Sequence, residues 1–121
     1  MTIEDVNPTA ITLDGYQFAA KQYAIYPVET AVEYTALGLA SEAGEVAGKV
    51  KKQIRDGGNW NGATREEHRQ ATIDELGDIL WYAAALAGHL NISLGEVALR
   101  NIRKLDSRSK RGTIGGNGDR R

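Results

Sequence analysis

Residues 30–55 read TAVEYTALGLASEAGEVAGKVKKQIR, and this stretch decides the fold. Its apolar residues recur at alternating steps of three and four, which is the spacing of one face of an α-helix. These residues are Val32, Ala36, Leu39, Ala43, Val46, Val50 and Ile54. The stretch opens on Thr30-x-x-Glu33, a capping-box pattern, and the Asp-Gly-Gly-Asn run at 56–59 can reverse the chain after it. The pattern predicts a long amphipathic helix with one apolar face.

Similar patterns before and after this stretch predict three more helices. Residues 13–24 form the first, and Pro27 breaks the chain after it. Residues 64–90 begin with a second capping box and carry a second apolar seam, and Ser93-x-x-Glu96 caps the last helix. No stretch alternates with period two for long enough to predict a strand. The fold class is therefore predicted to be all-α, with four helices.

The chain is expected to form one folded domain with a flank on each side. A length of 121 residues suits a single domain, and small helical domains often complete their core by pairing with another copy. We expect an N-terminal extension over residues 1–12, a helical domain over 13–108, and a flexible, basic and glycine-rich tail over 109–121. The resulting expectation is a four-helix bundle protomer that is completed by oligomerisation.

Composition narrows the class of protein. The chain has no cysteine, which excludes disulfides, thiolate zinc sites and cysteine nucleophiles. The first ten residues carry Glu4 and Asp5 and no apolar core, unlike a secretory signal. No apolar run approaches the roughly 20 residues that cross a bilayer. We therefore expect a cytoplasmic protein with no membrane partner.

Charge is distributed unevenly along the chain, although the net charge is only -1. From Arg100 onward there are eight basic and two acidic residues, whereas residues 1–99 hold seven basic and fourteen acidic residues. A basic end on an acidic body suits an anionic ligand or a contact with the acidic body of a neighbouring subunit. For the last dozen residues, a solvated tail is the simpler interpretation.

Two of the predicted helices carry the same acidic signature in their middle turns. Glu42-x-x-Glu45 lies in the second helix and Glu75-x-x-Asp78 in the third. A separation of three residues places both carboxylates of a pair on one helix face, one turn apart. Most of these carboxylates come one residue before an apolar seam position, so they flank the seam. If the two helices pack side by side, four carboxylates can converge.

Converging carboxylates need a positive counter-charge, and the type of their ligand atoms indicates which cation can supply it. Oxygen ligands without histidine or cysteine select a hard cation such as Mg²⁺ or Mn²⁺. Di-iron bundles would instead carry Glu-x-x-His, a pattern that neither His68 nor His89 completes. Because Mg²⁺ is usually shared with substrate phosphates, such a site predicts a phosphate-bearing substrate.

A simpler explanation of these acidic pairs is a solvated surface, since a single Glu-x-x-Glu on a helix is usually exposed. Glycines inside the same helices help to decide between a solvated surface and a site, because each glycine lowers helix stability by about 1 kcal/mol relative to alanine. They are Gly38, Gly44, Gly48 and Gly77. Either a packed helix or a ligand could approach the backbone at these positions, so spacing alone leaves both interpretations open.

Several linked motifs resemble those of the MazG-like nucleoside triphosphate pyrophosphohydrolases. They are GLASEAGEVAG at 38–48, Lys51-Lys52, DELGDILWY at 74–82, and Asn101-Ile102-Arg103-Lys104-Leu105-x-x-Arg108. The resemblance covers residues 13–108 and keeps the motifs in order. It implies a four-helix, all-α protomer that assembles as a homodimer or homotetramer.

The resemblance also implies an activity, which is the hydrolysis of (deoxy)nucleoside triphosphates to the monophosphate and pyrophosphate with Mg²⁺. Carried onto this chain, the metal ligands are Glu42, Glu45, Glu75 and Asp78. Bound Mg²⁺, for which Mn²⁺ can substitute, would polarise the α-phosphate and activate a water for in-line attack. A catalytic carboxylate of the first pair, Glu42 in preference to Glu45, would orient or deprotonate that water. Ser41 stands where many members carry another acidic residue, which leaves the number of metal ions open.

Cationic and aromatic side chains supply candidates for the rest of a nucleotide site. The phosphate-binding candidates are Asn101, Lys104, Lys52, Arg108 and Lys49, of which Asn101 and Lys104 best fit the family's pattern. Trp81 could stack on a base and Gln17 could read its edge. Core packing and solvated lysines are the common alternatives for such residues.

Two rival functions are compatible with the sequence. A dUTPase-like enzyme of the same all-α superfamily would share the acidic pairs but select uracil, and such chains are usually longer. A non-catalytic helical module would use its basic end to bind nucleic acid, and it would not depend on Glu45 or Asp78. No base-reading motif supports nucleic-acid binding. Base and sugar preference, whether for dGTP, dUTP or a broad range, stay open.

Overall fold

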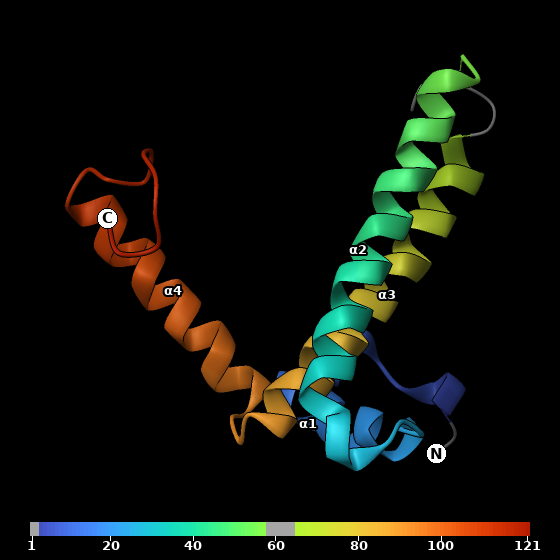
Figure 1. Cartoon of the computed structure of the whole chain (residues 1–121), viewed down its shortest axis with the longest axis horizontal. Helices are drawn as coiled ribbons and strands as arrows, with labels where there is room; N and C mark the ends of the chain where they lie inside the picture. Colours follow the sequence, from blue (N-terminus) through green and yellow to red (C-terminus); the bar gives the residue numbers. More distant parts are fainter. Residues whose placement is uncertain (1–2, 58–64) are drawn as a thin grey trace.

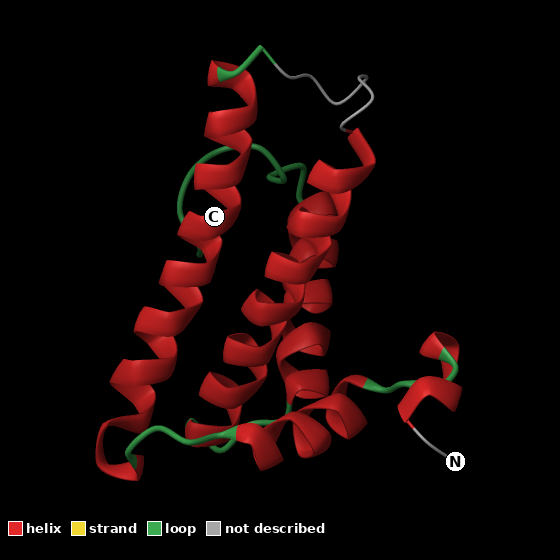
Figure 2. Ribbon diagram, turned by 90° about the vertical axis from the view of Figure 1, so that its right-hand side faces the viewer, coloured by secondary structure: helices red, strands yellow, loops and turns green. Residues whose placement is uncertain are grey.

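A computed structural model describes residues 3–57 and 65–121 of the chain. This part contains four α-helices: α1 (Leu13–Ala20), α2 (Ala31–Arg55), α3 (Arg65–His89) and α4 (Leu94–Lys110). Short 3₁₀ turns lie at Ile3–Asp5, Pro8–Ala10, Lys21–Tyr23 and Val28–Thr30, and no strand occurs over the described residues (Figure 2). The prediction of an all-α fold with four helices is therefore confirmed.

The long helices α2 and α3 lie side by side and run in opposite directions (Figures 1 and 2). The short α1 packs at one end of this pair, where it contacts both α3 and α4. From the same end α4 diverges from the pair, so that its last turns stand apart from α2 and α3 (Figure 1). None of the helices in the described ranges is long and apolar enough to cross a membrane.

The helix ends agree with the sequence patterns at some positions and not at others. Ser93 caps α4 as predicted, because its Oγ accepts the Glu96 N–H at 3.1 Å. Thr30 makes no capping hydrogen bond, so the capping box predicted there is wrong, and a 3₁₀ turn leads into α2 instead. Gly57 ends α2 with a φ of 74°, as its turn-forming context predicted. The second capping box begins at Thr64, which lies outside the described residues.

A left-handed residue ends α3 and redirects the chain toward α4. Asn91 has a φ of 58°, a conformation that asparagine tolerates better than most residues. Its N–H bonds the Gly88 carbonyl at 3.1 Å, and the Ile92 N–H bonds the Ala87 carbonyl at 3.0 Å. These two hydrogen bonds form a Schellman motif that satisfies the last carbonyls of α3. The capping residue Ser93 follows at once, so the two helices meet at a sharp corner.

The amide of Gln17 joins α1 to this corner. Its Nε2 donates to the carbonyls of Ala84 at 3.0 Å and Ile92 at 3.2 Å, and its Oε1 accepts the Leu94 N–H at 3.0 Å. One half-buried side chain therefore bonds three backbone groups from α3, the turn and α4. These contacts hold α1 across the base of the α2–α3 pair.

The fully buried core of a single chain is small. The buried apolar residues are Ala20, Ala31, Ala84, Ala87 and Leu94. Much of the predicted apolar seam is exposed to solvent instead: Leu76 on α3 is 53% exposed, and Ile54 on α2 is 72% exposed. On α4, Ile102 is 62% exposed. The helix periods were predicted correctly, but these apolar faces are not covered by any residue of the described part of the chain.

Close packing of α2 on α3 depends on a glycine. The ring of Tyr82 lies directly against the backbone of Gly38, where an added Cβ would overlap the ring. Around Gly48, on the same helix, no described atom lies within 4 Å of the position that a Cβ would take. The first glycine therefore has a packing role, and the second contacts no other described segment.

We expect Gly38→Ala to lower the free energy of unfolding by about 1–3 kcal/mol, because the new methyl group must displace an aromatic ring. The matched Gly48→Ala should raise it by up to about 1 kcal/mol through helix propensity. Thermal unfolding followed by circular dichroism at one protein concentration measures both. Equal shifts of the two variants would contradict the role of the Tyr82 ring.

Candidate metal centre

Three of the four predicted metal ligands lie together where α2 faces α3. Glu42 of α2 and Glu75 and Asp78 of α3 each offer one carboxylate oxygen, and these oxygens lie within 4.8 Å of one another. The convergence follows from the antiparallel packing of the two helices, since each acidic motif occupies the middle of its helix. We call these three residues the acidic group.

Glu45 does not belong to the acidic group, although it lies one turn along α2 from Glu42. Its side chain is exposed. Its negative charge is nevertheless close enough to raise the pKa of both Glu42 and Lys49. The structure thus places Glu45 at the margin of the site.

The carboxyl groups of Glu42 and Glu75 interact directly. A hydrogen bond to Glu75 is the main reason why the pKa of Glu42 is raised, followed by desolvation and the nearby charge of Asp78. Glu75 shifts the other way: its pKa is lowered, chiefly because Lys49 Nζ donates to its Oε1 at 2.8 Å. Glu42 therefore keeps its proton up to a higher pH than an ordinary glutamate does, and Glu75 loses its proton at a lower pH.

The donor set of the acidic group fits a hard divalent cation. It offers oxygen ligands only, and Mg²⁺ prefers octahedral oxygen coordination at about 2.0–2.1 Å. Opposite ligands of such an ion lie about 4 Å apart, so an oxygen spread of up to 4.8 Å is close to what the ion needs. The nitrogen ligand of a di-iron centre is not provided by His89, whose Nε2 lies 2.6 Å from the Tyr26 hydroxyl.

The phosphate-binding candidates divide into two sets. Lys49 touches the acidic group through Glu75, and Lys52 lies one turn further along α2 with an exposed side chain. The other candidates, Asn101, Lys104 and Arg108, all belong to α4, which diverges from the α2–α3 pair (Figure 1). A single chain therefore does not bring these three residues together with the acidic group.

An aromatic cluster lies beside the acidic group, and sequence reasoning found only part of it. It consists of Tyr26, Tyr34, Trp81 and Tyr82. Burial raises the pKa of Tyr82, and the charges of Glu42 and Asp78 add to the shift, which shows that this ring is close to the carboxylates. On α2, four-residue steps connect Tyr34 to Gly38 and Gly38 to Glu42, so a helical wheel could have found Tyr34.

Both candidates for base recognition are engaged in contacts within the chain. Trp81 packs edge-on against Tyr82, and its Nε1 donates to the Ala20 carbonyl at 3.1 Å. The Gln17 amide makes the three backbone hydrogen bonds described above and would have to break them to read a base. Gln17 also lines a cavity of about 480 Å³ between α1, the end of α3 and the turn before α4.

Comparison with known proteins places this geometry in a family. The model of the MazG nucleotide pyrophosphohydrolase domain matches residues 30–113, a range that contains both acidic motifs and the whole of α4. The chain is also 45% identical over 116 residues to the Gene 37 protein of Mycobacterium phage L5, covering 90% of this chain and 98% of that protein. No solved structure matches the chain. Because the matched domain includes the helices that form the acidic group, the chain belongs to the MazG nucleotide pyrophosphohydrolase family.

Proposed function

We propose that this protein hydrolyses a nucleoside or deoxynucleoside triphosphate to the monophosphate and pyrophosphate in a Mg²⁺-dependent reaction. The observation that carries the proposal is the convergence of Glu42, Glu75 and Asp78 within the region that matches the MazG domain. Carboxylates grouped in this way favour a cation that is shared with phosphate oxygens. The triphosphate of a nucleotide is the substrate that this chemistry suits.

In this proposal the acidic group holds Mg²⁺, and Glu45 joins it as a fourth ligand on the strength of the motif spacing. Bound Mg²⁺ supplies Lewis-acid stabilisation of charge on the phosphates and lowers the pKa of water. Glu42 accepts a proton from the attacking water, a role that suits a carboxyl group whose pKa is already raised by its neighbours. Asp78 and Glu75 would act only as ligands of the ion.

The cationic residues would neutralise the charge that the metal leaves uncompensated. Lys49 pairs with Glu75 of the acidic group, and Lys52 lies one turn further along α2 with an exposed side chain. Asn101, Lys104 and Arg108 would serve the phosphates only if α4 approached an acidic group, which calls for a second copy of the chain. We therefore propose a homodimer or homotetramer in which the exposed face of α4 is covered.

Hydrolysis is tested by incubating the protein with Mg²⁺ and each common NTP, dNTP and dUTP separately, and resolving the products. We expect monophosphate and pyrophosphate, with kcat/KM lowered about 100-fold or more in Glu75→Gln and Asp78→Asn, because each change removes charge that stabilises the transition state. Glu67→Gln, an exposed carboxylate two turns earlier on α3, is the control and should keep its activity.

The products distinguish this reaction from its rivals. Diphosphate and inorganic phosphate would show that the β–γ bond is cleaved and would overturn the assigned reaction. Turnover of dUTP alone would favour the dUTPase-like alternative. If the folded protein turned over none of these nucleotides, the proposal for common nucleotides would be wrong.

Metal binding should depend on pH in a direction set by Glu42. Its pKa is raised, so it takes up a proton at a higher pH than an ordinary glutamate does, and that proton competes with the cation. Affinity for Mn²⁺ should therefore be full at neutral pH and fall as the pH is lowered through a range that begins above the usual glutamate pKa. Calorimetric titration at successive pH values measures this. An affinity that stays constant down to the ordinary glutamate range would contradict it.

Assembly should bury the apolar face of α4. The face is formed by the exposed side chains of Val97, Ile102 and Leu105. Light scattering of the unaltered protein should give two or four times the chain mass of 13.1 kDa. Ile102→Glu together with Leu105→Glu should reduce it to a single chain, because charges would be buried at the interface. Arg103→Glu alters charge on the same helix outside this face and should leave the mass unchanged.

A further inference from the structure

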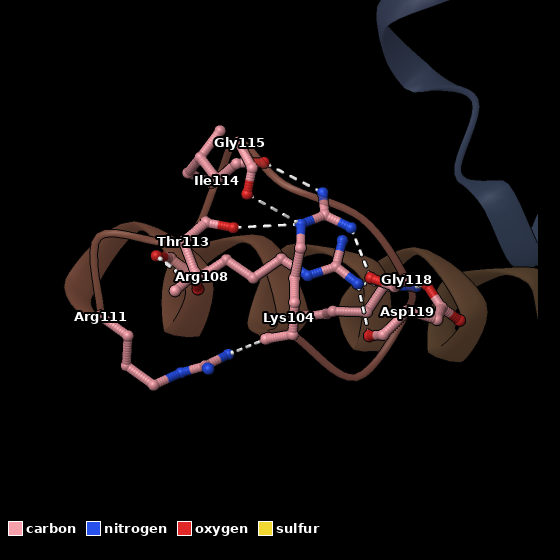
Figure 3. Close-up of polar contacts among 9 residues, drawn as sticks. Lys104, Arg108, Arg111, Thr113, Ile114, Gly115, Gly118 and Asp119 are labelled. Atoms are coloured by element: carbon pink, nitrogen blue, oxygen red, sulfur yellow. Dashed lines mark hydrogen bonds and ion pairs between the residues drawn. The ribbon is translucent and has the colours of Figure 1, made fainter.

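The segment after α4 folds back along the helix instead of continuing away from it (Figures 1 and 3). Gly112 has a φ of 69°, the left-handed conformation that a helix-ending glycine adopts. Its N–H bonds the Ser109 carbonyl at 3.1 Å, and the Thr113 N–H bonds the Arg108 carbonyl at 2.8 Å. This Schellman motif turns the chain, and we call residues 112–121 the closing loop.

The side chain of Arg121 gives the closing loop its shape. Its guanidinium donates to the carbonyls of Thr113 at 3.1 Å, Ile114 at 3.0 Å and Gly115 at 3.1 Å, and also to that of Gly118 (Figure 3). Four carbonyls of one short segment thus converge on one cation. Flexibility of residues 109–121 stays a prediction, but α4 continues to Lys110 and this segment has a defined set of contacts.

The closing loop brings a carboxylate onto two cations of α4. Asp119 Oδ1 accepts Lys104 Nζ at 2.9 Å and Arg108 Nη2 at 3.1 Å, and Arg108 Nη2 also donates to the Asp119 carbonyl (Figure 3). These two cations lie one turn apart on α4 and were both predicted to bind phosphate. The hydrogen bonds from Lys104 and Arg108 lower the pKa of Asp119, so the carboxylate is ionised at neutral pH.

The two sides of this contact differ sharply in burial. The side chain of Arg108 is only 7% exposed, whereas that of Asp119 is 81% exposed. Arg108 Nε is also buried, and it has no hydrogen-bond partner within the described part of the chain. The Arg108 guanidinium is therefore buried and has one N–H donor without a partner, whereas the Asp119 carboxylate that it contacts lies at the surface. A phosphate group offers more acceptor oxygens than the two that Asp119 uses here, which are Oδ1 and the main-chain carbonyl oxygen.

We propose that Lys104 and Arg108 form a phosphate-binding site that the closing loop occupies with Asp119 as an internal substitute for the ligand. The inference rests on the proposed function for the identity of the ligand, a nucleotide phosphate, and goes beyond it by assigning a self-inhibitory contact. A phosphate group gains access to the two cations by displacing the Asp119 carboxylate. The more stable the contact of Asp119 with Lys104 and Arg108 is, the more the closing loop weakens the binding of an anion to these two cations.

Inorganic tripolyphosphate tests this competition without metal or catalysis. It is titrated calorimetrically into the full chain in the presence of a chelator. Asp119→Asn should bind it about three- to fivefold more tightly than the unaltered protein, which is the upper part of the range expected for removing an exposed ion pair. The control is Asp106→Asn, which removes the same charge from a carboxylate that pairs with Lys110 at 2.7 Å and does not touch the proposed site. Its affinity should stay within about twofold of the unaltered protein.

Two further variants locate the effect. Lys104→Gln in the Asp119→Asn background should abolish the gain, because one of the two cations is lost. Arg121→Gln loosens the closing loop without altering the site itself, and it should also tighten binding although it removes a positive charge from the protein. Circular dichroism verifies that each variant keeps its helices.

Three results would overturn the inference: no tightening in Asp119→Asn, an equal tightening in Asp106→Asn, or a gain that survives Lys104→Gln. These outcomes are independent of the proposed hydrolysis, since no Mg²⁺ is present and tripolyphosphate is not a nucleotide. If the protein hydrolyses nucleotides but fails this test, the proposed function stands and the proposed competition by the closing loop is wrong. If it passes this test but hydrolyses no nucleotide, the phosphate site stands and the proposed enzymatic activity is wrong.

Discussion

Close approach of like charges at the α2–α3 contact is the constraint on which the rest of the site depends. Glu42, Glu75 and Asp78 would repel one another if all were ionised and uncompensated. A hydrogen bond between Glu42 and Glu75 and the ammonium of Lys49 relieve part of that repulsion. Two helices can thus pack face to face with carboxylates between them, and the same arrangement leaves those oxygens ready for a cation.

Local patterns predicted this part of the molecule well, because helix periods and motif spacing are properties of neighbouring residues. The four helices and the Ser93 cap were found in this way. The direction of α4, the three hydrogen bonds of Gln17 and the return of Asp119 to Lys104 were not, since each depends on contacts between distant parts of the chain. Thr30 makes no capping hydrogen bond, and the chain enters α2 through a 3₁₀ turn that includes Thr30.

The single chain buries few large apolar side chains. Its buried apolar residues are mostly alanines, while larger side chains such as Ile102 remain in contact with solvent. Polar contacts at one end of the molecule, above all the amide of Gln17, hold the corner between α3 and α4. In one protomer, these polar contacts therefore fix the corner between α3 and α4, although little apolar surface is removed from water.

The contact between Gly38 and Tyr82 has a consequence for how this protein can change over time. The two positions lie on different helices, yet the ring fills the space that a side chain at 38 would need. Position 38 therefore cannot readily take a larger residue while the ring remains at 82, so the order of change is fixed: the ring at 82 must be lost first. Because Tyr82 follows Asp78 by one turn, this coupled pair would also limit how far the surroundings of the acidic group can diverge among descendants of the same gene.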